Sequence, residues 1–362
     1  MGPAPMTGQL AGPVLVVGAG LLGTSIGLAL RRRGVEVHLS DVNPENVTIA
    51  TGLGAGTARE EDSRPQLVVV AVPPDHLANE ITRALEGTEA VVTDVGSVKS
   101  EPLRQVAGRV GAEVLRRYVG SHPMAGSERS GPFAASATLL DGRPWAVAPH
   151  ETSAPDAVTL VTGLVSLCGA TGIRFTPLEH DQAVARTSHL PHLLAALVAG
   201  RLADAPADHL MLSGQGVREV TRIAAGDPRL WQQIVTANAD ALTVLLGDVR
   251  ADLDRLLTAV SSGRRDEIGA LLDRGVAGTA AIPGKHGGPA EPMGALFVAV
   301  PDHPGELARL LADAGEIGVN VEDLHIDHDP GRPVGLVELT VASDRTDFLK
   351  ASLEARGWTA HR

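Results

Sequence analysis

The sequence has 362 residues, of which 44% are hydrophobic and 20% charged, so it can build packed cores and is not a disordered chain. Its 31 basic and 43 acidic residues give a net charge of −12, which argues against a nucleic-acid-binding protein. The single cysteine, Cys168, excludes an internal disulfide and suits a reducing compartment, for which we expect the cytoplasm. We expect neither a membrane span nor a signal peptide, because no long uninterrupted apolar run occurs and the N-terminus lacks a basic start.

The first half of the chain alternates strand-like and helix-like segments. Short apolar or β-branched runs predict strands, and the longer stretches between them predict helices. The predicted strands are 14–17, 35–39, 67–72, 90–94, 145–148 and 173–176, and the predicted helices are 21–33, 74–85 and 154–168. This alternation is typical of a parallel sheet with helices on both faces. We assign residues 1–177 to this α/β domain.

The second part, residues 178–282, carries almost no strand signal. We expect one helix over 178–204 with a kink near Pro191, followed by helices over 230–259 and 264–276. So many apolar helices in a small all-helical domain indicate burial against a second copy, and a homodimer is therefore expected.

The last part begins with a Gly- and Pro-rich linker, 283–293. After it, residues 294–362 alternate in the order βαββαβ, which is typical of a ferredoxin-like plait. The predicted strands are 295–300, 319–328, 333–341 and 358–361, and the predicted helices are 305–314 and 345–355.

A glycine-rich turn, Gly18-Ala-Gly20-Leu-Leu-Gly23, lies directly between the first predicted strand and the first predicted helix. Glycines at this spacing permit a tight turn, close approach of the backbone to a pyrophosphate, and close helix–strand packing. The helix N-terminus then offers free N–H groups to the phosphates. This context indicates a Rossmann-type dinucleotide-binding domain, with a purely structural turn as the alternative. Further expected cofactor contacts are Leu21, Leu22, Val72 and Pro73.

Asp41 closely follows the second predicted strand, 41 − 20 = 21 residues beyond Gly20. A carboxylate at this spacing accepts hydrogen bonds from the ribose 2′-hydroxyl and repels a 2′-phosphate. We therefore expect NAD rather than NADP as the cofactor. The alternative is that Asp41 caps the helix that begins at Pro44.

Three polar clusters remain. Asp94-Val-Gly-Ser97-Val-Lys99 ends a strand, where an open α/β sheet faces its ligand. The second is GSHPMAGSE, residues 120–128, and the third combines SHLPH, residues 188–192, with TRIAAGDPRLW, residues 221–231. Each has a structural alternative, such as a turn at the His-Pro pair or a packed histidine pair. We expect no metal, because zinc sites bring three or four clear ligands.

Taken together and in this order, these motifs resemble the prephenate and arogenate dehydrogenases, the tyrosine-pathway family. The resemblance runs from about Val14 to Ala280 and is clearest in HPMAGSE and TRIAAGDPRLW. It implies oxidative decarboxylation of a cyclohexadienol: the carbon bearing the 4-hydroxyl gives hydride to NAD, the ring carboxylate leaves as CO2, and the ring becomes aromatic. Prephenate is the expected substrate and arogenate the alternative, and no residue decides between them.

The resemblance also implies roles for individual residues. His122 would accept the proton of the 4-hydroxyl group, because an imidazole of ordinary pKa can be neutral, and so accept a proton, at physiological pH. Ser97 would hydrogen-bond both the hydroxyl and His122, and Arg222 would bind a substrate carboxylate with two hydrogen bonds. The rest of the substrate pocket would be formed by Ser127, Glu128, His189, His192, Trp231 and Lys99.

Residues 294–362 resemble an ACT domain, a small-ligand sensor. Asp302-His303-Pro-Gly305 joins its first strand to its first helix, where a glycine allows close backbone approach and a helix N-terminus favours a carboxylate. This implies a regulatory site at Asp302, His303 and Gly305, with tyrosine as the expected effector. A purely structural dimerisation plait is the alternative.

Two other classes of function compete with this interpretation. A β-hydroxyacid dehydrogenase of similar architecture would need a catalytic lysine on its helical domain, and residues 179–280 contain none. A non-catalytic sensor of NAD and an amino acid would not need Ser97, His122 and Arg222 together.

Overall fold

The computed structural model describes residues 10–60, 62–125, 130–283, 292–328 and 334–362. The chain forms two compact units, 1–250 and 251–362, and the division falls within the long helix α12 (Ala239–Ser261). Among the described helices, none combines the length and the apolar character that crossing a bilayer requires.

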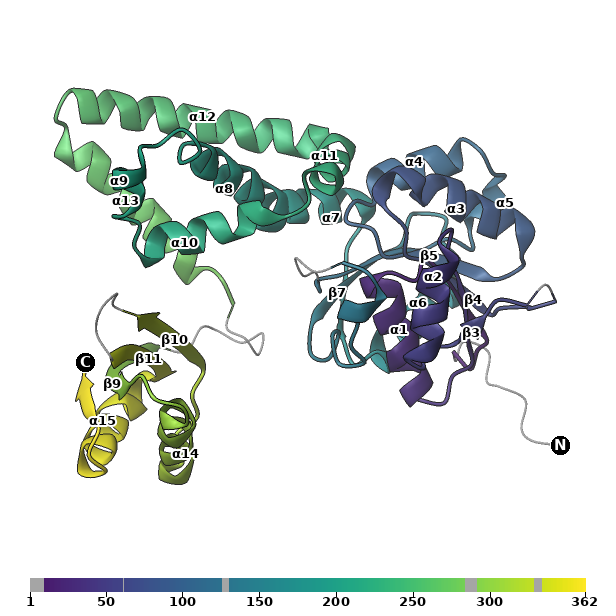
Figure 1. Ribbon diagram of the computed structural model, residues 1–362. Helices are drawn as coiled ribbons and strands as arrows, with labels where there is room; N and C mark the ends of the chain where they lie inside the picture. The colour runs from purple at the N-terminus through teal and green to yellow at the C-terminus, as the bar shows by residue number, and fades with distance from the viewer. Residues whose placement is uncertain (1–9, 61, 126–129, 284–291, 329–333) are drawn as a thin grey trace. The chain divides into compact units, whose positions relative to one another are not determined.

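The first unit is built around a five-stranded parallel sheet (Figure 1). Its strands are β1 (Val14–Val17), β2 (Val37–Ser40), β3 (Thr57–Ala58), β4 (Leu67–Val70) and β5 (Val91–Asp94). They lie in the order β3-β2-β1-β4-β5, so the chain turns to opposite sides of β1. Ligands of open α/β sheets bind at the carboxyl edge beside such a switch point.

Alternate side chains of β1 enter two different cores. Val14 and Val16 pack with Ile26 of α1 (Leu21–Arg32), whereas Leu15 packs on the other face with Leu77 of α3 (Pro74–Gly87). Period-two alternation in a strand that is buried on both faces produces this division. The expected sheet with helices on both faces is confirmed.

The strands that follow differ from the expectation of one continuous parallel sheet. β6 (Gly120–Pro123), β7 (Pro144–Ala148) and β8 (Thr171–Arg174) form a separate sheet, in which β6 runs antiparallel to β7. β6 was not predicted, because Gly-Ser-His-Pro carries no strand pattern of its own. Pairing with the buried β7 imposes its extended conformation, and α6 (Pro155–Leu167) packs beside this sheet.

The predicted helix 178–204 is interrupted rather than simply kinked. α7 (Pro177–Val184) begins with a capping box, in which Thr176 Oγ1 accepts the Glu179 N–H at 3.2 Å and the Glu179 carboxylate accepts the Thr176 N–H at 2.8 Å. A π-helical turn (Ala185–His189) then leads into α8 (Leu190–Gly200), whose first turn contains Pro191. Single π-turns of this kind are frequent at functional sites.

Further helices complete the first unit. They are α2 (Pro44–Gly52), α4 (Ser100–Ala107), α5 (Ala112–Leu115), α9 (Ala207–Leu210), α10 (Gln215–Arg222) and α11 (Pro228–Ala237). The predicted helix 230–259 is broken at Asn238, which separates α11 from α12.

The second unit contains an antiparallel sheet of strand order β10-β11-β9-β12. Its elements are α13 (Arg265–Ala280), β9 (Met293–Pro301), α14 (Glu306–Ile317), β10 (Asp323–His328), β11 (Val334–Ala342), α15 (Thr346–Ala355) and β12 (Thr359–His361). Alternate residues of β9, such as Leu296 and Val298, pack with Leu310 of α14 and Leu349 of α15, so both helices share one core with the sheet. Most of the predicted linker 283–293 lies outside the described residues.

Candidate active site

The glycine-rich turn has the geometry of a nucleotide-binding loop. Gly18 has φ +101°, and a Cβ there would lie 2.2 Å from the Ala71 carbonyl oxygen, while a Cβ on Gly23 would lie 1.9 Å from the Gly18 oxygen. A Cβ on Gly20 would meet no described atom within 4 Å. The first and third glycines are therefore required by the protein's own packing, and the second leaves open space beside the N-terminus of α1, which is where a pyrophosphate approaches in such folds.

Asp41 is anchored to that turn. One of its carboxylate oxygens accepts the Ala19 N–H at 2.7 Å and the other accepts the Asn43 N–H at 2.8 Å. Asn43, rather than Asp41, caps α2, because its side chain accepts the Glu45 N–H at 3.0 Å. A carboxylate has about four lone-pair positions, so Asp41 retains capacity for a ribose hydroxyl.

The other expected cofactor residues follow strand ends on the same side of the sheet. Leu21 and Leu22 form the first turn of α1, which follows β1, and Val72 and Pro73 lie between β4 and α3. All four therefore lie where the carboxyl ends of adjacent parallel strands meet.

Lys99 is buried, with a side chain 1% exposed, although the sequence predicted a substrate contact. Its ammonium group forms an ion pair with Asp94 and donates to the Ser121 carbonyl at 2.8 Å. Asp94 also accepts the Tyr118 hydroxyl at 2.8 Å. Lys99 therefore links β5 to β6 through its bonds to Asp94 and Ser121. It can influence the site through its charge, but not through a direct contact of its buried side chain.

Ser97 lies partly buried in the connection from β5 to α4. Among the described residues no hydrogen bond joins it to His122, and its predicted bond to the histidine stays a prediction for the substrate-bound enzyme.

His122 lies partly buried on β6, and its Nδ1 pairs with His180 Nε2 at 3.0 Å. Burial, together with the neighbouring His180 ring and the positive charge of Lys99, lowers the pKa of His122 well below 6.5. Its imidazole is therefore neutral at neutral pH, which is the state that accepts a proton.

The hydrogen-bonded contact of His122 continues through two residues of α7, His180 and Asp181. The sequence analysis gave neither of them a role. His180 Nδ1 lies 2.8 Å from the Asp181 carboxylate, and that carboxylate also accepts the backbone N–H groups of Lys99 and Ser100 at 2.8 Å each. Burial alone would raise the pKa of Asp181, but these hydrogen bonds outweigh it and lower the pKa. The signal in the sequence is an adjacent His-Asp pair on the buried face of a predicted helix, close before SHLPH.

The structure brings His189, His192 and Trp231 together, and their role as lining of the substrate pocket stays a prediction. Trp231 stacks on His192 with 3.5 Å between ring centroids and meets His189 edge-on at 6.0 Å. Asn238, in the break between α11 and α12, bonds both His189 Nδ1 at 3.1 Å and the Asp181 carbonyl at 2.9 Å. Burial lowers the pKa of His189 to about 4, so this imidazole is uncharged at neutral pH.

Arg222 ends α10, with its side chain exposed, directly before Ile223. Burial lowers the pKa of His192, partly opposed by the Ile223 backbone, and the turn Ile223–Ala225 that follows α10 packs against α8, which carries this histidine. A Cβ on Gly226 would lie 2.5 Å from Trp231 Nε1, so this turn requires glycine. Two further predicted pocket residues, Ser127 and Glu128, lie outside the described residues.

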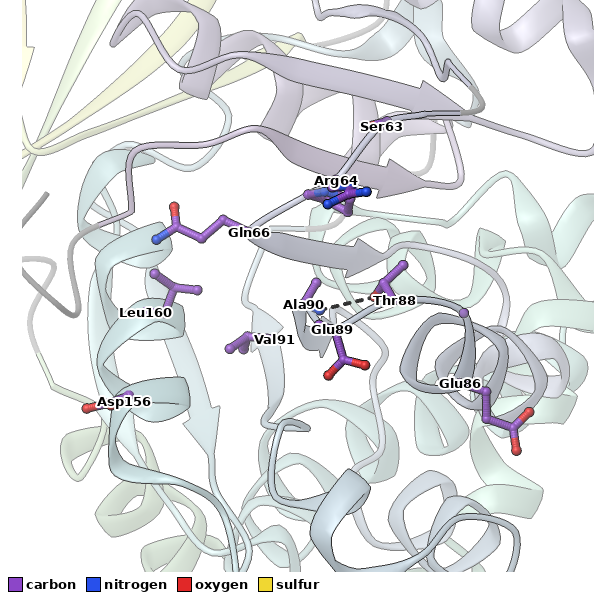
Figure 2. Close-up of a pocket in the computed structure, with 12 residues that line it drawn as sticks. Ser63, Arg64, Gln66, Glu86, Thr88, Glu89, Ala90, Val91, Asp156 and Leu160 are labelled. Carbon is purple, nitrogen blue, oxygen red and sulfur yellow. Dashed lines mark hydrogen bonds between the residues drawn. The ribbon is translucent and has the colours of Figure 1, made fainter. Parts of the chain in front are cut away.

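A hollow of about 650 Å³ elsewhere in the first unit is lined by residues that precede β4 and β5, among them Arg64, Gln66, Glu86 and Glu89 (Figure 2). It therefore lies at the amino edge of the parallel sheet. The nucleotide turn and Asp94 lie at the carboxyl edge, so this hollow is not the active site.

The first part of the chain matches two family profiles. The profile described as the nucleotide-binding domain of prephenate dehydrogenase matches residues 26–174, and the one described as its dimerization domain matches residues 176–274. A probable prephenate dehydrogenase of Streptomyces niveus is 35% identical over 96% of this chain and 99% of its own length. The cyclohexadienyl dehydrogenase of Zymomonas mobilis is 30% identical over 69% of this chain and 88% of its own.

A solved structure shares the fold of this part. The prephenate dehydrogenase of Aquifex aeolicus, in complex with hydroxyphenyl propionate and NAD+, superimposes with a TM-score of 0.67 and 27% identity over 74% of this chain and 96% of its own. With these matches and with the geometry of its glycine-rich turn, the chain belongs to the prephenate dehydrogenase family and is an NAD-dependent oxidoreductase.

Proposed function

We propose that this enzyme oxidises prephenate with NAD, releasing CO2 and forming 4-hydroxyphenylpyruvate. The observation that carries the proposal is the hydrogen bond of His122 on β6 to His180 of the helical part of the same unit, and burial lowers the pKa of His122, which favours its neutral form. A base at this position suits the removal of a hydroxyl proton during hydride transfer.

The dinucleotide would bind along the carboxyl edge of the parallel sheet. Gly18, Gly20 and Gly23 form the turn for the pyrophosphate, and Asp41 accepts a ribose hydroxyl. The dinucleotide would also contact Leu21, Leu22, Val72 and Pro73. Bound NAD supplies the acceptor for the hydride.

His122 takes the proton of the 4-hydroxyl group while the C4–H bond breaks as hydride. The bond between the ring and its carboxylate then breaks, CO2 leaves, and the electron pair of that bond makes the ring aromatic. The protonated His122 returns its proton to the phenolic oxygen. Because aromatisation makes the reaction favourable, the protein mainly has to orient the substrate and handle one proton.

Substrate recognition is assigned to polar groups around this base. Arg222 binds a carboxylate through its planar guanidinium group, and Ser97 donates to the 4-hydroxyl oxygen. His189, His192 and Trp231 form one wall of the pocket in this proposal, and the contacts between their rings support it. Ser127 and Glu128 complete the pocket in this proposal, and Lys99 contributes its positive charge.

Turnover of the purified enzyme tests the substrate. NADH formation and the ring product are measured with prephenate and with arogenate at equal concentration, with His122→Asn as the inactive control. A large preference for prephenate is expected. Preference for arogenate would change the substrate and keep the chemistry, and turnover of neither would refute the proposed function.

We further propose that residues 178–282 form the dimerisation domain of a homodimer that acts in the cytoplasm. Leu253, Leu257 and Val260 of α12 are 59–66% exposed and recur at helical spacing on one stripe. On α13, Leu272 and Val276 repeat this pattern at 65% and 68% exposure. Light scattering should give twice the mass of the chain, and a monomer would contradict the proposal.

The third proposal assigns residues 294–362 to an ACT domain, with 283–293 as its linker. The order β9-α14-β10-β11-α15-β12 and the sheet order support it. Gly305 at the start of α14 has φ +97°, and no described atom lies within 4 Å of a Cβ built on it. Together with Asp302 and His303, this turn would receive the charged groups of an amino acid, with tyrosine as the expected effector.

Steady-state inhibition by tyrosine tests the effector. The full chain is compared with a chain that ends at Pro283, and the shorter chain should be active and less inhibited. Equal inhibition of both chains, competitive with substrate, would mean that tyrosine acts at the active site and that this domain is not its sensor.

A further inference from the structure

His122, His180 and Asp181 form one hydrogen-bonded line that joins β6 to α7. The His122 Nδ1 to His180 Nε2 distance is 3.0 Å, and the His180 Nδ1 to Asp181 Oδ1 distance is 2.8 Å. His180 and Asp181 are only 1% and 3% exposed, so water cannot readily replace either partner.

The donors and acceptors of this line determine where its protons lie. The Asp181 carboxylate already accepts two backbone N–H groups, from Lys99 and Ser100, which favours its ionised, acceptor-only form. His180 Nδ1 must therefore donate to Asp181. Burial lowers the pKa of His180, so this ring is neutral at neutral pH and its Nε2 accepts. His122 must then donate from Nδ1, which leaves the lone pair on its Nε2.

We propose that His180 and Asp181 are positioning residues for the dehydrogenase reaction, which hold His122 as the Nδ1–H tautomer so that Nε2 is the base. This inference rests on the proposed function. When Nε2 takes the hydroxyl proton, the Nδ1–H bond to His180 persists and the positive charge on His122 faces an acceptor backed by the Asp181 carboxylate. The same proton returns from Nε2 to the product oxygen, so no proton leaves through His180.

Asp181 also has a structural role, since its carboxylate binds the backbone at the start of α4. A variant of Asp181 would therefore change both the orientation of His180 and the stability of the fold, so the test uses variants of His180 instead. His180→Leu removes the acceptor for the His122 Nδ1–H group. His180→Gln replaces it with an amide oxygen that can still accept. His150→Gln is the matched control, because His150 is a partly buried histidine that bonds the Leu115 carbonyl away from this line.

The tautomer is measured directly in the free enzyme. The protein is labelled with 15N-histidine, the His122 signals are identified by their loss in His122→Asn, and the 15N shifts show which ring nitrogen carries hydrogen. We expect a protonated Nδ1 and an unprotonated Nε2 in the wild type. We expect a mixture of tautomers in His180→Leu and the wild-type pattern in His180→Gln and His150→Gln.

Kinetics give the second measurement. His180→Leu should lower kcat roughly 10–100-fold, the order expected when a positioning partner is lost, while Kd for NAD changes less than about twofold. His180→Gln should recover most of kcat, and His150→Gln should match the wild type. If His180→Leu does not fold, the 15N spectrum of the wild type and the spectrum and kcat of His180→Gln still test the proposed tautomer.

Hydrogen on Nε2 of His122 in the wild type would overturn the inference, and so would an unchanged tautomer and kcat in a folded His180→Leu. These outcomes are distinct from failure of the proposed function, which would show as a wild-type enzyme that turns over neither prephenate nor arogenate. The NMR measurement needs no turnover.

Discussion

Replacing Lys99 by methionine should lower the unfolding temperature of the first unit. The substitution leaves the Asp94 carboxylate, which is 0% exposed, without its cationic partner. Losing one member of a buried ion pair costs about 3–5 kcal/mol. Tyr118 and the Gly96 N–H still donate to Asp94, so we expect the lower end of that range. At roughly 2–4 °C per kcal/mol for a unit of this size, a cost of about 3 kcal/mol lowers Tm by about 6–12 °C.

Thermal unfolding followed by circular dichroism measures this shift, and KM for prephenate is measured well below the transition. The double variant Asp94→Asn/Lys99→Met should regain part of the lost stability, because no unpaired charge then remains buried. Lys350→Met is the matched control: its ion pair with Glu354, at 3.1 Å, involves a side chain 35% exposed. Such surface pairs contribute about 0–1 kcal/mol, so Tm should hardly change.

The two roles considered for Lys99 give opposite results. A buried ion pair predicts a lower Tm for Lys99→Met with only a modest rise in KM, because the side chain does not contact the substrate and only its charge is lost from the site. An unchanged Tm with a strongly raised KM would refute the structural argument and restore the substrate contact predicted from the sequence.

Four further predictions concern the site. His122→Asn should fold and bind NAD but lose turnover by roughly 10²–10⁴-fold, and near-wild-type turnover would remove His122 from catalysis. Because burial lowers the pKa of His122, wild-type kcat/KM should persist as the pH falls through 6.5 and fall only below it; a decline centred at 6.5 or above would contradict this. Asp41→Ser should weaken NAD binding and admit NADP, whereas a wild type that prefers NADP would show that Asp41 does not select NAD. Arg222→Ala should raise KM for the substrate and leave NAD affinity unchanged, with partial rescue by lysine; equal losses for both ligands would indicate a structural role.

The sequence alone determined the parts of this protein whose requirements are local. The turn from β1 to α1 is specified by glycines within six consecutive residues. A Cβ atom on Gly18 or Gly23 would clash with a backbone oxygen, so no other residue fits at either position. The strand and helix pattern of the sheet also follows from short periodic runs, which is why β1 and α1 were predicted almost to the residue. The resemblance of HPMAGSE and TRIAAGDPRLW indicated the chemistry, but not which distant residues lie beside them.

Tertiary structure decided the features that depend on partners distant in the chain. His122 and His180 are 58 residues apart, and the Lys99 N–H and Asp181 are 82 apart. The extended form of β6, the burial of Lys99 and the line from His122 to Asp181 all depend on such pairs. A hydrogen bond or an ion pair forms only when folding brings both groups out of water to the same place, and no periodicity of either segment encodes that meeting.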